Sequence, residues 1–339
     1  MSSQTTHARV IAVVLTYNRK NLLAECLEAL SRQTRPCDEI FVIDNASTDS
    51  TAEFVEEQWA SKVSLYRLPA NIGAAGGFNA GLRIAYQHEP DFIWLMDDDV
   101  IPEENCLEGL LEADRTLQAR GVERSFLVPT AWTPEGLATN VPEIDRRHNV
   151  LAYENWASLL DVNLVPVTRA TFVGILLPRE TVSRYGLPIA DMFIWGDDTE
   201  YTVRISKKTP GFIVGTCKVC HIRALSGSLS ILTENDPVRI RYHKLHIRNL
   251  FYTAYRHHGK RAAIGFIKRR LLTIMKLARL GHGRKALLIL SGLLDGFRFN
   301  PVVESAESNQ GGGRSASQAE VPRADQPPTP SAVLHQPRA

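Results

Sequence analysis

The sequence has little cysteine and no long apolar run. Its 339 residues include five cysteines, an odd number without regular spacing, so we expect no disulfide framework and favour a reducing cytoplasm. No stretch reaches about 18 uninterrupted apolar residues, the length that a membrane-spanning helix requires. The N-terminus has no basic segment followed by an apolar stretch of signal length, so we expect no secretion signal. The length suffices for one large α/β domain with an appendage.

Negative charge is nearly missing from one segment. Between Arg239 and Arg298 the sequence has 15 lysine and arginine residues and a single acid, Asp295. Residues 1–238 carry 21 basic and 32 acidic residues, so the overall net charge of +2 hides an acidic body and a basic C-terminal segment. Such an asymmetry suggests that the basic segment meets an anionic surface. No DNA- or RNA-binding motif accompanies the charge, so we do not expect nucleic acid as the partner.

Short apolar runs alternate with amphipathic segments in the first third of the chain. This pattern indicates a doubly wound parallel sheet with helices on both faces. Ligands of such sheets bind outside the carboxyl ends of the strands, where polar residues cluster here. The predicted strands are Val10–Leu15, Glu39–Ile43, Val63–Arg67 and Phe92–Met96, and the predicted helices are Lys20–Gln33, Thr51–Trp59 and Gly76–Tyr86.

The rest of the chain is less regular. Strands are predicted at Phe126–Val128, Thr171–Leu177 and Phe212–Thr216, and a helix from Thr199 to Lys208. From about Val303 the sequence is rich in Ser, Gly, Pro and Gln, and it cannot bury enough apolar area to offset the entropy of ordering. We therefore expect an α/β domain over residues 1–236, a basic helical region over 237–302 and a disordered tail over 303–339.

Three consecutive aspartates, Asp97, Asp98 and Asp99, follow the apolar strand at 92–96. Like charges this close repel, and without a cation at least one carboxyl would be protonated. Mg²⁺ or Mn²⁺ resolves the repulsion, because hard divalent ions take oxygen ligands and keep positions open for phosphate oxygens. The alternative is a solvated acidic turn. The apolar strand before the triplet and the polar strand ends beside it favour the metal site.

Two other strand ends have polar or glycine-rich sequences. Asp44 ends the second strand, where an acid commonly binds the ribose or base of a nucleotide, although it could also cap a turn. The run from Asn71 to Gly77 lacks the Gly-Lys-Ser/Thr end of a Walker loop. Its glycines would let the backbone approach a ligand and open the following helix.

Several motifs in order resemble glycosyltransferase family 2. They are the segments VVLTYNR, VIDNASTD, NIGAAGGF and WLMDDD, followed by FIWGDDTEY and His221, which are similar to the family's bacterial galactofuranosyltransferase and rhamnosyltransferase branch. The resemblance covers roughly residues 9–222 and implies a GT-A fold and an inverting sugar transfer from a nucleotide-diphosphate donor. It implies that Asp97, Asp99 and His221 hold Mn²⁺ or Mg²⁺. It also implies a nucleotide pocket lined by Thr16, Arg19, Asp44, Asn45 and Asn71, and we add Asp98 to these cofactor-binding residues.

A second acidic pair is the candidate for the general base, since the base must lie opposite the leaving group. Asp197 and Asp198 open a predicted helix, so their alternative role is N-terminal capping. By the resemblance Asp198 is the base, and Asp197 orients the acceptor or positions Asp198. Trp195 could stack on an acceptor sugar or belong to the core. The Cys-x-x-Cys-His pattern that ends at His221 also matches covalent haem attachment, which the expected strand and the absence of a signal disfavour.

The basic segment has the pattern of an interfacial helix. Between Lys260 and Phe299 apolar residues at helical spacing are interleaved with lysines and arginines. The alternative is a helical appendage packed on the catalytic domain. A membrane contact would suit a lipid-linked or polysaccharide acceptor, and we expect a peripheral position on the cytoplasmic face of the plasma membrane.

The favoured donor is UDP-galactofuranose, with dTDP-rhamnose as the alternative. A sugar nucleotidyltransferase would have an early Gly-rich loop with Arg and Lys, and the Thr16-Tyr17-Asn18-Arg19 segment argues against it. A non-catalytic glycan-binding scaffold is disfavoured because the acids of both sites are intact.

Overall fold

The computed structural model describes residues 7–222 and 229–308. The strands are β1 Val10–Thr16, β2 Glu39–Asp44, β3 Ser64–Arg67, β4 Phe92–Asp97, β5 Val100–Pro102, β6 Leu127–Trp132, β7 Ala138–Thr139, β8 Glu143–Ile144, β9 Leu164–Arg169, β10 Ile175–Pro178 and β11 Gly211–His221. The helices are α1 Lys20–Ser31, α2 Thr51–Gln58, α3 Gly73–Gln87, α4 Cys106–Ala119, η1 Asn155–Val162, α5 Arg179–Tyr185, η2 Ala190–Met192, α6 Asp197–Ile205, α7 Pro237–Arg279 and α8 Gly283–Arg298.

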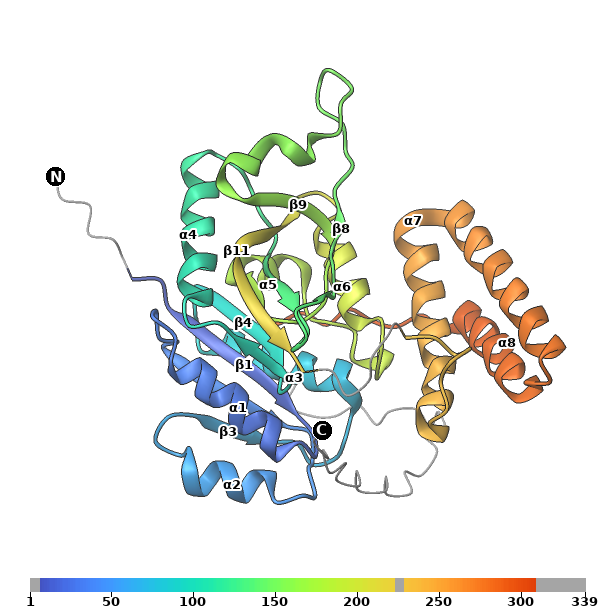
Figure 1. The fold of residues 1–339 in the computed structure, drawn as a ribbon, viewed down its shortest axis with the longest axis horizontal. Coiled ribbons are helices and arrows are strands. Elements are labelled where there is room, and N and C mark those ends of the chain that lie inside the picture. The colour runs from blue at the N-terminus through green and yellow to red at the C-terminus, as the bar shows by residue number, and fades with distance from the viewer. Residues whose placement is uncertain (1–6, 223–228, 309–339) are drawn as a thin grey trace, which may run out of the picture. The chain divides into compact units, whose positions relative to one another are not determined.

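A mixed sheet in the order β3-β2-β1-β4-β10-β6-β11-β9-β8 forms the centre of the protein (Figure 1). The first four strands of this order are parallel, as predicted, and β10 is antiparallel to both of its neighbours. In β1, Thr16 is paired with Asp44 of β2, and Leu15 is paired with Asp97 of β4. The register therefore brings the polar strand ends to one edge of the sheet.

Successive residues of β1 face two separate cores, because side chains alternate along a strand. Val10, Ala12 and Val14 pack with α1, α2 and α4 on one face of the sheet. Ile11 and Val13 pack with α3, α5 and α6 on the other face. The structure confirms the doubly wound arrangement that the strand–helix alternation predicts.

The glycines of α3 allow a close approach to other parts of the protein. A Cβ on Gly77 would lie 2.4 Å from a methyl group of Leu15, and one on Gly81 would lie 2.8 Å from Val13. Gly73 begins the helix with a φ of +76°, and a Cβ there would meet the carbonyl oxygen of Phe193 at 2.2 Å. The sequence interpretation assigned the glycines of the 71–77 run to ligand approach, whereas Gly73 and Gly77 of that run allow contacts within the protein.

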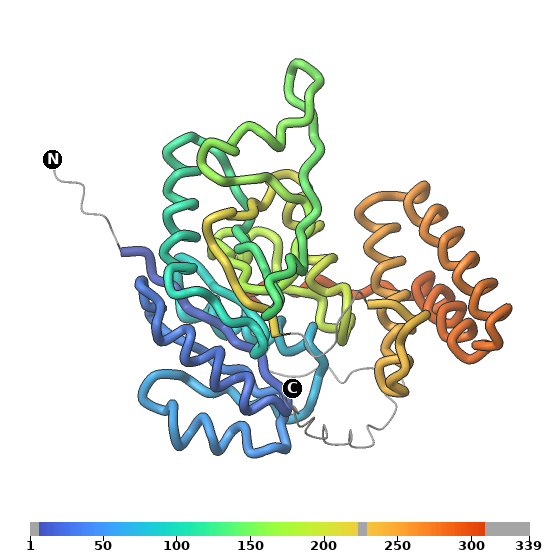
Figure 2. The backbone as a smooth tube through the Cα atoms, in the orientation of Figure 1, coloured from blue at the N-terminus to red at the C-terminus, as the bar shows by residue number. Residues whose placement is uncertain are grey.

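The basic helical region is a pair of helices, α7 and α8, with its own core (Figure 2). α7 bends at Gly259, whose φ is 83°. The helices pack around Phe251, Phe266, Leu277 and Ile289. None of the helices in the described part of the chain is long and apolar enough to cross a membrane.

Some expectations for the later part of the chain need correction. The predicted strand at 171–177 forms only from Ile175, and β9 was not predicted. The segment at 303–307 packs against the α/β domain. The Glu304 carbonyl accepts a hydrogen bond from Leu187 N–H, and the Tyr86 hydroxyl donates to Glu307. The chain thus contacts the α/β domain as far as Glu307, whereas the disordered tail was expected to begin at residue 303. The rest of the predicted tail, 309–339, lies outside the described residues.

Candidate functional site

The aspartate triplet meets Thr16 and Arg19 at the carboxyl end of β4. The Thr16 hydroxyl donates a hydrogen bond of 2.7 Å to Asp98 Oδ2. Arg19 Nη1 donates to Asp98 Oδ1 at 3.2 Å and to Asp99 Oδ2 at 2.9 Å. Two of the predicted nucleotide-pocket residues therefore lie directly beside the triplet, and the arginine supplies part of the positive charge that three adjacent carboxyls require.

The three carboxyls of the triplet differ in acidity. Burial and repulsion from its two neighbours raise the pKa of Asp97 well above its usual value. Burial, partly offset by Arg19, raises the pKa of Asp98 to about 6. Burial opposes ionisation of Asp99 as well, but contacts with His221 and Arg19 outweigh it and lower the pKa. The site thus favours the ionised form of Asp99 and disfavours that of Asp97, and an additional cation beside Asp97 would favour its ionised form.

His221, the last residue of β11, faces Asp99. Its Nε2 lies 3.3 Å from Asp99 Oδ1, and its Nδ1 lies 2.8 Å from Asn140 Oδ1. Because an amide oxygen only accepts, Nδ1 donates to Asn140, and Nε2 faces the Asp99 carboxylate. The predicted three-ligand cluster with Asp97 is not gathered, since residues 7–222 and 229–308 contain no group of three or more Asp, Glu, His or Cys suited to a metal ion.

Asp44, at the end of β2, is fully buried. Its Oδ1 accepts a hydrogen bond of 2.8 Å from Ser47 N–H, which is the turn-capping alternative that the sequence left open. Its Oδ2 lies 3.6 Å from Arg67 Nε and has no hydrogen-bond partner among the described residues. One carboxylate oxygen therefore holds the turn, and the other remains able to accept a hydrogen bond.

Asn45 and Asn71 bind each other and the loop before α3. The Asn45 amide donates to Asn71 Oδ1 and to the Gly73 carbonyl, each at 3.1 Å. Asn45 Oδ1 accepts from Ile72 N–H, and Asn71 Oδ1 accepts from Gly73 N–H. Both side chains are used to fix this loop beside the carboxyl end of β2.

The second acidic pair opens α6, as predicted, and both carboxyls are shifted toward the protonated state. Burial and the neighbouring Asp198 raise the pKa of Asp197 to about 8. Burial also raises the pKa of Asp198, although Thr199 N–H donates a hydrogen bond of 2.6 Å to its Oδ1. Repulsion from Asp197 is the smallest of the causes that raise the pKa of Asp97, so the two acidic sites are within electrostatic reach of each other.

Trp195 is half-buried against α7. Its ring centre lies 5.1 Å from that of His243 and 5.9 Å from that of Tyr242, and the Arg239 guanidinium lies 5.1 Å from it. Much of the ring is therefore enclosed by a helix that follows the α/β domain in the chain, and only the remaining exposed part is available to an acceptor.

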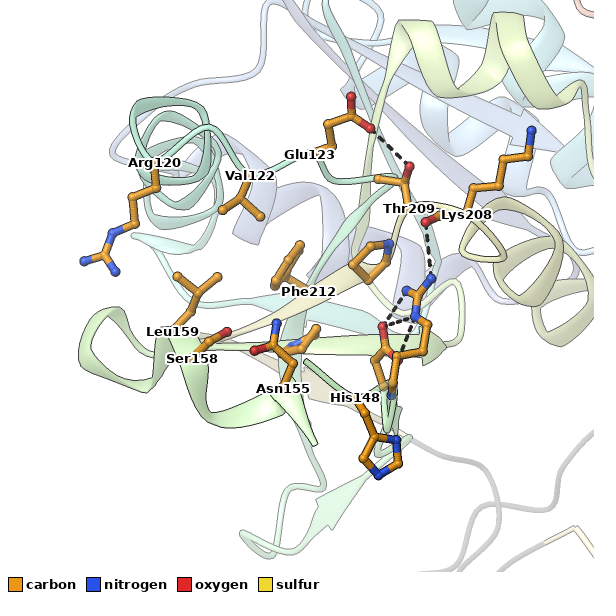
Figure 3. Close-up of a pocket in the computed structure, with 14 residues that line it drawn as sticks. Arg120, Val122, Glu123, His148, Asn155, Ser158, Leu159, Lys208, Thr209 and Phe212 are labelled. Atoms are coloured by element: carbon orange, nitrogen blue, oxygen red, sulfur yellow. Dashed lines mark hydrogen bonds and ion pairs between the residues drawn. The ribbon is translucent and has the colours of Figure 1, made fainter. Parts of the chain in front are cut away.

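A surface cavity of about 600 Å³ lies away from these residues (Figure 3). Its lining includes Phe212 at the beginning of β11 together with Arg120, Asn155 and Lys208. His221 lies at the opposite end of β11, and none of the predicted site residues lines this cavity.

The sequence interpretation missed Asn140, Arg67 and Asn249, each of which contacts the site. Asn140 lies in the irregular connection between β7 and β8 and is 81 positions from His221, so no local pattern marks it. Asn249 lies in α7, 57 positions from Met192, whose carbonyl it contacts, so no local pattern marks it either.

Comparison with known proteins gives concordant matches. Residues 11–122 match the family model of glycosyl transferase family 2. The chain is 32% identical over 215 residues to the galactofuranosyltransferase GlfT1 of Mycolicibacterium smegmatis, covering 62% of this chain and 70% of the relative. It is also 32% identical to GlfT1 of Mycobacterium tuberculosis, covering 61% and 67% of the two chains.

Two solved structures share the fold. GalNAc-T7, crystallised with UDP, GalNAc and Mn²⁺, matches with a TM-score of 0.54 and 16% identity over 74% of this chain. The match spans only about half, 51%, of the GalNAc-T7 chain. Residues 1–349 of S. aureus TarS match with a TM-score of 0.50 and 14% identity, covering 84% of this chain and 90% of that chain. At these identities the two matches concern the fold alone, which is GT-A.

Proposed function

The chain belongs to glycosyl transferase family 2, and from this membership we propose that it transfers galactofuranose from UDP-galactofuranose to a hydroxyl group of a glycan acceptor, with inversion at the anomeric carbon. The observation that carries the proposal is the presence of two separate acidic sites, one after β4 and one at the start of α6, in a chain 32% identical to galactofuranosyltransferases. The similarity to two galactofuranosyltransferases favours this donor over dTDP-rhamnose.

The donor would lie along the carboxyl ends of β1, β2 and β4. Asp44 Oδ2 is buried without a hydrogen-bond partner among the described residues and would accept from the nucleoside. Arg19 would contact the diphosphate, and Thr16 would hold Asp98 in place through its hydroxyl. Asn45 and Asn71 would shape the pocket by fixing the loop at 71–73.

The residues around Asp99 fit a divalent cation such as Mn²⁺ or Mg²⁺. Asp99 Oδ1 lies 3.3 Å from His221 Nε2 and has no hydrogen-bond partner in the described part of the chain. Carboxylate oxygens and imidazole nitrogens both bind divalent transition-metal ions, and an imidazole that donates its other N–H to an oxygen is typical of a metal ligand. Asp99 and His221 would hold the ion. When bound, it would stabilise the charge that develops on the leaving diphosphate.

Asp198 would take the proton of the acceptor hydroxyl. Burial raises its pKa toward the working range of a general base, and Thr199 N–H fixes the direction of its carboxylate. Asp197, with a pKa of about 8, would be protonated at neutral pH and would donate a hydrogen bond to the acceptor. The exposed part of the Trp195 ring would pack against the acceptor sugar.

A donor screen tests the proposed transfer. Purified protein with Mn²⁺ is given UDP-galactofuranose or dTDP-rhamnose together with a lipid-linked glycan, and products are read by mass spectrometry. We expect a mass increase of one hexose with the first donor only. A deoxyhexose product would replace the proposed donor with rhamnose, and no product with either donor would contradict the proposed activity.

The acceptor would be lipid-linked, and α7 and α8 would contact an anionic membrane. Of the apolar residues at helical spacing that the sequence shows, Ile267, Ile274 and Leu277 pack inside the helix pair. A second stripe is exposed: Leu272 is 62% exposed and Leu287 is 65% exposed. Exposed apolar side chains with flanking cations favour the surface of an anionic bilayer. The exposed stripe consists of Ile264, Leu271, Leu272, Met275, Leu287, Leu290, Leu294 and Phe297.

A further inference from the structure

The segment that leads into the acidic pair has an unusual backbone. Phe193 has φ 62° and ψ −60°, and Ile194 N–H donates to the Met192 carbonyl at 2.7 Å. This is a γ-turn with positive φ, the rarer and more strained of the two forms. Trp195 follows with φ 59° and Gly196 with φ 103°. Such conformations persist only where surrounding contacts hold them.

One buried side chain of α7 supplies much of that restraint. Asn249 is fully buried, and its amide nitrogen lies 2.9 Å from the Met192 carbonyl oxygen, 3.1 Å from that of Ile194 and 2.9 Å from that of Trp195. Its own oxygen accepts a hydrogen bond from Arg248 Nε at 3.0 Å, which orients the amide. A single side chain therefore caps three carbonyls of the strained segment.

The contact is close and leaves little freedom for the segment. A Cβ on Gly196 would lie 3.3 Å from the Asn249 Cβ. On the other side, Ala75 N–H of α3 donates to the Phe193 carbonyl at 3.0 Å. The segment is thus held between α3 and α7, and the Gly196 carbonyl accepts the hydrogen bond from Glu200 N–H that opens α6.

We propose that Asn249 is a positioning residue, which fixes the 192–196 segment and thereby sets the place of the Asp197–Asp198 pair relative to the donor. The inference rests on the proposed function, in which Asp198 is the base. It also makes α7 part of the catalytic site, because the side chain that holds the segment comes from that helix. A displacement of about 1 Å at a reacting group can cost on the order of 100-fold in rate.

The test compares Asn249→Ala with a matched control. Asn79→Ala also removes a buried amide, which donates to the Pro188 carbonyl at 2.8 Å, outside the strained segment. We expect Asn249→Ala to lower kcat about 10- to 100-fold, with UDP affinity within about threefold of wild type because the donor contacts lie on other elements. Asn79→Ala should lower the melting temperature and leave kcat unchanged.

A folded Asn249→Ala protein with kcat within about threefold of wild type would overturn the inference, as would an equal loss of kcat in Asn79→Ala. If Asn249→Ala does not fold, Asn249→Ser, which keeps one donor, is judged by the same criterion. Wild-type transfer is measured first: if the wild type forms no product, the proposed function fails and the positioning role with it. Wild-type transfer together with an unaffected Asn249 variant overturns the positioning role alone.

Discussion

Replacing Asp198 by asparagine separates proton transfer from folding and donor binding. The two side chains have nearly the same volume, and the amide oxygen can still accept the 2.6 Å hydrogen bond from Thr199 N–H. The amide cannot accept the hydroxyl proton. Because the surroundings of Asp198 raise its pKa and so disfavour its charge, removing that charge should not destabilise the fold.

The expected loss follows from the role of a general base. Such a group contributes about 100- to 10,000-fold, which is about 3–5 kcal/mol of transition-state stabilisation. We therefore expect kcat to fall by that factor, with UDP affinity unchanged. The loss should appear in kcat and kcat/KM alike, because the interaction exists only in the transition state.

The assay measures initial rates of galactofuranose incorporation and UDP binding by calorimetry. Asp191→Asn is the matched control, since this exposed aspartate lies in the same segment, six positions before the pair. It should transfer at the wild-type rate. An Asp198→Asn protein that retains more than about a tenth of wild-type kcat would refute the assignment of the base, and loss of UDP binding would show that the change acts on the donor site.

Three further outcomes are expected. Because the pKa of Asp197 is raised to about 8 in the folded state, its contribution to stability is present below about pH 4 and is lost as pH rises through 8. The melting temperature, measured by differential scanning fluorimetry, should therefore fall between about pH 5 and 8, and Asp197→Asn should make this fall smaller. Asn140→Ala should weaken Mn²⁺ binding 10- to 100-fold by freeing the His221 ring, and equal affinities by electron paramagnetic resonance would contradict the ligand assignment. Replacing Leu287 and Leu294 by serine should reduce cosedimentation with phosphatidylglycerol vesicles but not with phosphatidylcholine vesicles, whereas the comparably exposed Leu137→Ser should bind like wild type.

The sequence predicts the parallel half of the sheet well and its antiparallel half poorly. β1, β2 and β4 each contain a continuous apolar run that ends in polar residues, and β1, β2 and β3 are neighbours in the sheet in their order along the chain. β9 was missed because Pro166 interrupts its apolar pattern, and proline within a run argues against a strand. In the structure this strand pairs with β11 and with the short β8 near the end of the sheet.

The residues of the candidate site also differ in how well the sequence predicts their positions. Asp97 to Asp99 could be placed at a strand end because the strand before them is unmistakable. The partner of His221 could not be predicted, because Asn140 lies in an irregular loop and itself has a positive φ of 47°. Asn249 acts through carbonyl groups, which leave no trace in the amino-acid pattern of the segment it holds.

The close packing of α3 against β1 and the Phe193 backbone limits the positions at which donor selectivity could be engineered. Any side chain at Gly77 or Gly81 would displace Leu15 or Val13 from the core, and any at Gly73 would collide with the Phe193 backbone. A library that randomises this helix would therefore return mostly unfolded protein. Variation at Arg67, whose side chain is exposed, would explore new nucleotides and leave the turn that Asp44 holds intact.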